Sequence, residues 1–209
     1  MTSDSRANGV RLTLLTHPAT ESLVTSTFPH DDPLLPAGLR AAKDAAARLT
    51  AYRSAGWRCG PALRCRQTVA ALGATDVSID DALDECDFGS WRGRTIDELA
   101  AADPSGLEAW LTDPDAAPHG GESVRDLLYR ATKWLDEVGT GPVRTVGVTH
   151  AAMVKAVLVV ALSAPPAAFW RLDVAPLTRT DLSGRPGSWT VRRTAERLAP
   201  APAPAPAPE

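Results

Sequence analysis

The sequence predicts an α/β fold of three layers, in which helices flank a mostly parallel central sheet. Short runs of strand-forming residues alternate with longer helical segments, which is the order that parallel sheets require. Two histidines, His17 and His150, each come directly after a predicted strand. The length of 209 residues fits one domain, and a hydrophobic share of 44% is enough for a sizeable core.

The first half of the chain is expected to supply three strands and two helices. Apolar runs predict strands at 11–16, 57–59 and 77–79. Pro18 biases His17 away from helical geometry, so the first strand ends in a loop. Leucine and alanine at helical spacing predict a helix at 37–53, and Pro61 opens a second helix that runs to about residue 72.

The second half is expected to supply three more helical segments and two strands. The region 80–94 is predicted as a loop, followed by two short helices at 95–102 and 105–112. Apolar residues every three to four positions predict a long amphipathic helix at 122–138, which Glu122 and Ser123 are expected to cap. A buried strand at 143–149, an apolar helix at 151–162 and a last strand at 189–193 complete the fold.

The predicted domain covers residues 10–195 and is flanked by two segments without a core. Residues 1–9 are polar and are expected to be a disordered lead-in. Residues 196–209 alternate alanine with proline, which favours an extended chain and is expected to give a disordered tail.

Composition excludes several classes of function. Lysine plus arginine is 22 and aspartate plus glutamate is 25, so the net charge of −3 does not suit a nucleic-acid binder. The chain has no apolar run long enough for a membrane span and no signal-peptide core, which predicts a cytoplasmic protein. Its three cysteines form no CxxC pair and are expected to fill the core as free thiols, and the six tryptophans are expected in the core or a pocket wall.

The two histidines locate the expected ligand site. In open α/β sheets, ligands bind outside the carboxyl ends of the strands. Because His17 and His150 each follow a strand, both are expected at that edge of the sheet.

Six segments carry a resemblance to one known family. In chain order they are Leu14–Thr20, Pro33–Ala42, Pro61–Thr68, Leu83–Gly93, Gly120–Ser123 and Val148–Ala152. Each is similar to a motif of the histidine phosphatase superfamily, in its phosphoglycerate-mutase-like branch. The resemblance extends over residues 11–193 and implies the fold of that branch.

The resemblance also implies phosphoryl transfer through a covalent phosphohistidine. His17 would be the nucleophile, which needs an unprotonated ring nitrogen. Arg64 would bind the phosphoryl oxygens with its planar guanidinium, and His150 would donate a hydrogen bond to them. Glu85 would protonate the leaving oxygen and then deprotonate the hydrolytic water.

Three positions depart from the family pattern and weaken the expected phosphate clamp. Thr16 stands where the motif has arginine, Pro18 where it has glycine, and Leu23 where it has asparagine. A charged hydrogen bond contributes about 1.5–3 kcal/mol, so loss of the arginine alone lowers transition-state affinity about ten- to a hundredfold. Thr16 and Thr20 are assigned to phosphate binding, and Arg92 is a further candidate cation.

Three functions are compatible with this pattern. The first is hydrolysis of a small-molecule phosphomonoester with a weakened clamp. The second is a catalytically impaired relative that binds a small anion or a protein. The third is a divalent metal site of His17, Glu85 and His150, against which the nearby Arg64 argues. A mutase must keep its phosphohistidine from water and rebind a bisphosphate intermediate. Hydrolysis is favoured over a mutase reaction, because the weakened clamp and the few cations of this site suit that task poorly.

Neighbouring residues compete for two of these roles. Arg66 lies two positions from Arg64, and the place of Arg64 at a helix start favours it as the inward residue. Asp84 and Asp87 compete with Glu85, which the motif selects. No cofactor and no metal are expected. The expected partner is a small phosphorylated substrate, without nucleic acid or membrane, and the expected state is a monomer or homodimer.

Overall fold

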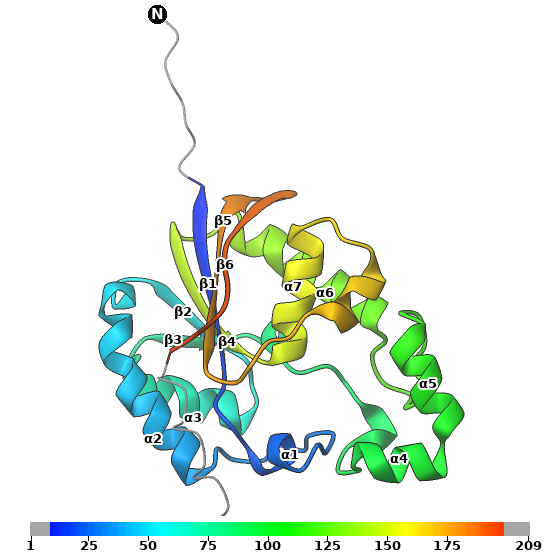
Figure 1. Ribbon diagram of the computed structural model, residues 1–209. Coiled ribbons are helices and arrows are strands. Elements are labelled where there is room, and N and C mark those ends of the chain that lie inside the picture. Colours follow the sequence, from blue (N-terminus) through cyan, green and yellow to red (C-terminus); the bar gives the residue numbers. More distant parts are fainter. Residues whose placement is uncertain (1–8, 199–209) are drawn as a thin grey trace, which may run out of the picture.

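The computed structural model describes residues 9–198 as a six-stranded sheet with helices on both faces (Figure 1). The strand order is β3-β2-β4-β1-β5-β6. The strands are β1 (Val10–Thr16), β2 (Gly56–Cys59), β3 (Val77–Ile79), β4 (Arg144–Thr149), β5 (Thr178–Arg185) and β6 (Ser188–Arg197). The first four strands pair in parallel, whereas β5 and β6 form an antiparallel hairpin beside β1. The mostly parallel α/β fold predicted from the sequence is confirmed.

Helices cover the two faces of the sheet and bury a separate core on each (Figure 1). One face carries α2 (Pro36–Ala45), the 3₁₀ helix η1 (Ala46–Tyr52) and α3 (Leu63–Leu72). The other face carries α6 (Val124–Val138) and α7 (Ala151–Ala161). The largest fully buried side chain, Trp134, lies in the α6 and α7 core, as expected for an apolar helix face at this spacing.

Six shorter elements complete the fold. They are α1 (Glu21–Val24), η2 (Asp81–Leu83), η3 (Gly89–Trp91), α4 (Ile96–Ala102), α5 (Pro104–Thr112) and η4 (Pro166–Arg171). Of these, α1 and α4 lie beyond the carboxyl edge of the parallel strands (Figure 1). The backbone N–H of Asp126 donates to the Ser123 hydroxyl and that of Ser123 to the Asp126 carboxylate, so Ser123 caps α6 as predicted. Glu122 does not cap this helix, because its carboxylate pairs with Arg130.

The structure differs from the sequence prediction at the last two strands. Strand β5 was absent from the prediction, because its buried positions include Thr178 and Thr180, whose polarity hides the alternating pattern. Strand β6 continues past the predicted 189–193 to Arg197, and the following Leu198 is buried. The predicted boundary at residue 195 is therefore too early. Residues 1–8 and 199–209, which contain most of the predicted lead-in and tail, lie outside the described residues.

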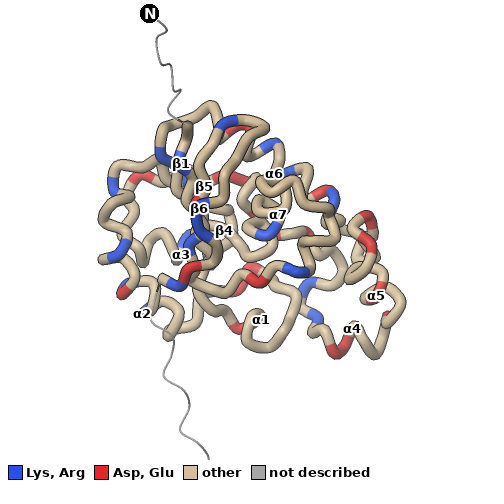
Figure 2. The backbone as a smooth tube through the Cα atoms, turned by 45° about the horizontal axis from the view of Figure 1, so that its top comes forward, with Lys and Arg blue, Asp and Glu red and all other residues tan. Residues whose placement is uncertain are grey.

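The strand register aligns the ends of β1 and β4. Thr16 pairs with Thr149, so His17 and His150 leave the sheet side by side. The backbone N–H of His17 donates to the Thr149 carbonyl at 3.2 Å. None of the helices in residues 9–198 is long and apolar enough to cross a membrane. Charges of both signs are spread over the described elements (Figure 2).

Candidate active site

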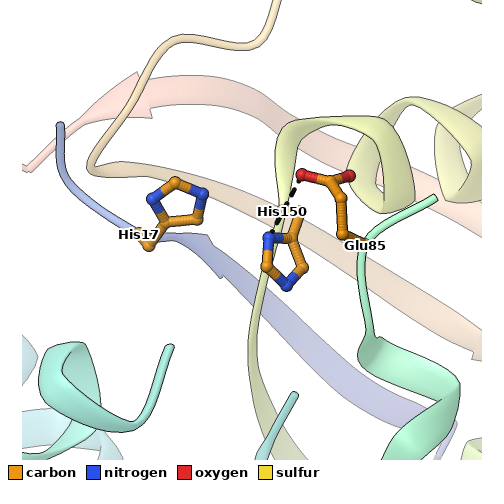
Figure 3. Close-up of side chains that lie close together, drawn as sticks. All are labelled: His17, Glu85 and His150. Atoms are coloured by element: carbon orange, nitrogen blue, oxygen red, sulfur yellow. Dashed lines mark ion pairs between the residues drawn. The ribbon is translucent and has the colours of Figure 1, made fainter. Parts of the chain in front are cut away.

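His17, Glu85 and His150 converge at the carboxyl edge of the sheet (Figure 3). The two imidazole rings lie 5.2 Å apart between centroids and meet edge to face. The Oε2 atom of Glu85 lies 3.3 Å from Nδ1 of His150. His17 follows β1, His150 follows β4, and Glu85 comes from the loop after η2. The structure thus brings together three residues separated by 65 or more positions in the sequence.

The backbone fixes the protonation of the His17 ring. Its Nδ1 lies 2.7 Å from the carbonyl oxygen of Pro18, which can only accept a hydrogen bond. Nδ1 therefore carries the proton, and Nε2 carries the free lone pair. Burial, together with the positive fields of His150 and Arg64, lowers the pKa of His17 to about 3, although Pro18 and Glu85 oppose this shift. His17 is therefore a neutral imidazole at physiological pH.

The surroundings of Glu85 hold it ionised in the free site. Burial alone would raise the pKa of this carboxyl, but the charge and hydrogen bond of His150, with Arg64 and His17, lower its pKa to about 2. Asp84, its competitor in the sequence, also approaches His150, at 3.8 Å from Nε2, but half of its side chain is exposed. The structure therefore places both carboxylates near His150 and gives Glu85 the closer, more buried position.

Arg64 points inward from the first turn of α3, as predicted, whereas Arg66 is exposed. The Arg64 guanidinium is buried, and its Nε lies 3.3 Å from His150 Nδ1. Its Nη1 donates to the carbonyl of His30 at 2.8 Å, and its Nη2 lies 3.9 Å from Glu85 Oε2. This long separation from Glu85 leaves the guanidinium available to a ligand oxygen that enters between them.

The two threonines assigned to phosphate differ in their placement. Thr20 lines the same cleft as His17 and caps α1 by accepting from the Leu23 N–H. Thr16 is not among the residues that line the cleft. Its hydroxyl donates to the Ala175 carbonyl and accepts from the Thr178 N–H, each at 2.9 Å. The assignment of Thr16 to phosphate binding is therefore corrected: the side chain ties β1 to the segment before β5.

The other residues singled out by the motif comparison surround this site. Leu23, which the resemblance aligns with an asparagine of the family motif, lines the cleft. Pro18 supplies the carbonyl that orients His17. Arg92 lines a neighbouring cavity, which shares Arg64 and Glu85 with the cleft, and it pairs with Asp87 at 2.8 Å through exposed side chains. All three cysteines are free and buried, as predicted.

Arg130 on α6 positions the loop that carries Glu85, a role that the sequence did not reveal. Its guanidinium donates to the backbone carbonyls of Ala82, Asp84 and Glu85 at 2.9–3.1 Å. The same group makes a two-pronged ion pair with Glu122 at 2.6 and 2.8 Å. A planar guanidinium can hold five acceptors at once, which a lysine cannot. Arg130 thus holds the Glu85 loop in place, although it does not itself line the cleft.

A cleft of about 310 Å³ opens in front of His17, Arg64 and Glu85. Ala151 and Ala152 line it at the first turn of α7, where backbone N–H groups lack partners inside the helix and attract anions. Lys155, one turn further along α7, also lines the cleft. Helical periodicity places Lys155 on the same face as Ala151, a signal that could have identified it from the sequence.

The three converging residues also have the composition of a metal site. One ligand atom from each of His17, Glu85 and His150 lies within 4.8 Å of the others. A guanidinium in hydrogen-bond contact with His150 opposes a second cation at this point, because like charges in a buried site repel. Among the described residues, these three donors therefore suit an anion between them better than a metal ion.

The strand order and the histidine pair define an α/β protein whose candidate ligand site lies at the carboxyl edge of its sheet. The sequence matches the model of the histidine phosphatase superfamily (branch 1) over residues 12–197. The chain therefore belongs to the histidine phosphatase superfamily, and the resemblance seen in its motifs is confirmed at that level.

Named relatives are similar over parts of their length. The chain is 39% identical over 115 residues to a bifunctional protein of Mycobacterium tuberculosis, covering 53% of this chain and 32% of that protein. It is 41% identical over 80 residues to glucosyl-3-phosphoglycerate phosphatase of Mycolicibacterium vanbaalenii, covering 37% of this chain and 36% of that enzyme. These matches span only about a third of the relatives' own length.

Solved structures are similar over nearly the whole described chain. Mycobacterial glucosyl-3-phosphoglycerate phosphatase in complex with VO3 has a TM-score of 0.79 at 28% identity, covering 90% of this chain and 99% of that chain. A structure named mycobacterial hydrolase 1 has a TM-score of 0.81 at 27% identity with the same coverage. The fold and the family are thus shared with phosphatases.

Proposed function

We propose that the chain hydrolyses a small phosphomonoester through a covalent intermediate on His17, with a weakened phosphate clamp. The observation that carries the proposal is the hydrogen bond from His17 Nδ1 to the Pro18 carbonyl. It leaves Nε2 with a free lone pair, and the lowered pKa of His17 keeps that lone pair unprotonated. The phosphatases among the relatives support the same class of reaction.

In the first step, His17 Nε2 attacks phosphorus and the bond from phosphorus to the leaving oxygen breaks. Arg64 and the first turn of α7 line the cleft in which charge gathers on the phosphoryl oxygens, and His150 lies 3.3 Å from the Arg64 guanidinium. The approach of an anionic phosphate raises the pKa of Glu85 from its low value in the free site, because like charges disfavour the carboxylate. Glu85 then carries the proton that the leaving oxygen takes.

In the second step, Glu85 accepts a proton from water, whose oxygen attacks the phosphorus of phospho-His17. The bond from Nε2 to phosphorus breaks, which restores neutral His17 and releases inorganic phosphate. Lys155 is the second cation of the cleft and compensates in part for the arginine that Thr16 replaces. The clamp is weaker than the family motif because a flexible ammonium makes one point contact, whereas a guanidinium makes two.

A comparison of wild type with His17→Ala on phenyl phosphate tests this proposal. Wild type is expected to release phosphate and, after alkaline quenching, to show the added mass of one phosphoryl group on His17. His17→Ala is expected to lose both signals. Turnover that survives in His17→Ala would exclude the covalent route. Loss of wild-type turnover on adding a chelator would favour the metal site, and absence of any wild-type turnover would favour a binding module.

A further inference from the structure

We propose that the cleft selects phosphomonoesters whose leaving group is apolar, such as an aromatic or alicyclic alcohol. The inference rests on the proposed function, because the leaving group is defined relative to the phosphoryl group on His17. It is carried by the wall of the cleft, by the residues at its mouth and by its supply of cations.

Five aromatic side chains contribute to the wall of the cleft. Phe28, Trp110, Phe169 and Trp170 line the cleft together with Phe88. The rings interlock edge to face: Phe28 lies 5.5 Å from Trp110, which lies 4.4 Å from Trp170. A ring of a bound molecule can extend this edge-to-face packing, which aromatic pairs prefer. These rings offer few hydrogen bonds to the hydroxyls of a sugar or glycerol, so burying hydroxyls against them is costly. The hydroxyl side chains of the lining all come from the segment 20–27 and are Thr20, Ser22, Ser26 and Thr27.

Two large apolar side chains stand exposed at this cleft. Leu23 from α1 is 45% exposed and Ile96 from α4 is 44% exposed, and both belong to the cleft lining. A bound apolar group would remove their surface from water, which is favourable in proportion to the area covered. Leu23 also occupies the position of the asparagine in the family motif. The substitution therefore removes a polar contact and adds an apolar one at the same place.

Few cations line the cleft. Among the described residues, Arg64 and Lys155 are the cations in the lining. Arg64 is buried against His150, and the Lys155 ammonium lies 5.5 Å above the Phe169 ring. Burial lowers the pKa of Lys155, although Asp173 and Glu85 oppose this shift. The proposed function uses both cations at the phosphoryl group, so the lining has no further cation to pair with a carboxylate on the leaving group.

Two alkyl esters of matched reactivity test the preference with the full chain. The kcat/KM for 2-phenylethyl phosphate is compared with that for ethyl phosphate, since each ester releases a primary alcohol as its leaving group. We expect at least about a tenfold preference for the phenyl compound, the scale of selection by an apolar pocket. 3-Phosphoglycerate is expected to be the poorer substrate beside 2-phenylethyl phosphate. Equal use of ethyl phosphate, or better use of 3-phosphoglycerate, would overturn the inference.

Two variants at neighbouring exposed positions test whether the cleft causes the preference for 2-phenylethyl phosphate over ethyl phosphate. Leu23→Asn is expected to reduce the preference about threefold or more, since it removes apolar contact at an exposed site. Val24→Asn is the matched control, because Val24 is also exposed, at 64%, but does not line the cleft. An equal effect of the two variants would overturn the role given to Leu23.

Binding of phosphonates separates the inference from the proposed function. The quenching of tryptophan fluorescence reports binding of 2-phenylethylphosphonate and ethylphosphonate, whose carbon–phosphorus bond is not hydrolysed. If no ester turns over but the phenyl compound binds about tenfold more tightly, hydrolysis is wrong and the apolar preference stands. Equal binding of the two phosphonates would overturn the preference whatever the outcome of the activity assay.

Discussion

Arg130 offers a direct test of how the fold holds the acid in place. Arg130→Met keeps the aliphatic stem of the side chain but removes the guanidinium. The change leaves the Glu122 carboxylate, whose side chain is only 15% exposed, without its partner and frees three loop carbonyls. Removing one partner of a largely buried pair costs about 3 kcal/mol. In a protein of this size, that corresponds to a fall in Tm of about 6–12 °C.

Activity should fall together with stability, because Arg130 orients Glu85 through its backbone. The kcat on phenyl phosphate is expected to fall about tenfold, with a smaller change in KM, since proton transfer depends on the position of the acid. Arg130→Lys, which restores one donor, is expected to recover part of both losses.

The matched control lies on the same helix. Arg125 pairs with Asp115 through side chains that are more than half exposed, so Arg125→Met is expected to leave Tm essentially unchanged. Thermal unfolding followed by circular dichroism compares the two variants at one pH. A Tm for Arg130→Met within about 2 °C of wild type would refute the role given to Arg130 in holding the Glu85 loop.

Three further predictions concern the site itself. Arg64→Lys replaces the fork by one ammonium and is expected to lower kcat/KM on phenyl phosphate about ten- to a hundredfold, with exposed Arg66→Lys as control; an unchanged rate would refute the phosphoryl role. The pKa of His17 is about 3 in the fold and 6.5 ordinarily, so between these values the unfolded chain binds the extra proton and stability is lost as pH falls. Urea unfolding should therefore show a steeper loss for wild type than for His17→Asn from pH 7 to pH 5, and equal slopes would contradict the lowered pKa. Thr16→Arg is expected to lower Tm without raising kcat/KM, because it breaks the hydrogen bonds to Ala175 and Thr178; a gain in activity would show that an arginine still fits the phosphate site.

The convergence of the two histidines could be predicted from sequence because it depends on strand ends. Once β1 and β4 are predicted as parallel strands of one sheet, His17 and His150 must leave that sheet at the same edge, and the structure makes the two strands neighbours. The inward direction of Arg64 follows equally from its place in the first turn of α3. These features depend on local periodicity and on rules of topology, both of which a single sequence contains.

The parts that escaped prediction depend on contacts across long separations in the chain. Arg130 binds a loop about 45 residues earlier, and nothing in an amphipathic helix pattern distinguishes it from other polar-face arginines. Thr16 was assigned to phosphate by its place in the motif, but its hydroxyl bonds to a segment 159 or more positions away. Strand β5 is hidden because its buried Thr178 and Thr180 find hydrogen-bond partners outside the strand, which a hydrophobic pattern does not register.

The two outer strands of the sheet have a consequence for self-association. An outer strand exposes unpaired N–H and carbonyl groups that can pair with another molecule. Strand β3, at one side, is only three residues long, which leaves little backbone to recruit a partner. Strand β6, at the other side, is ten residues long and carries charged side chains at Arg192, Arg193, Glu196 and Arg197. The short length of β3 and the charges of β6 both disfavour pairing with a second molecule. The β5–β6 hairpin therefore also disfavours edge-to-edge association of the protein.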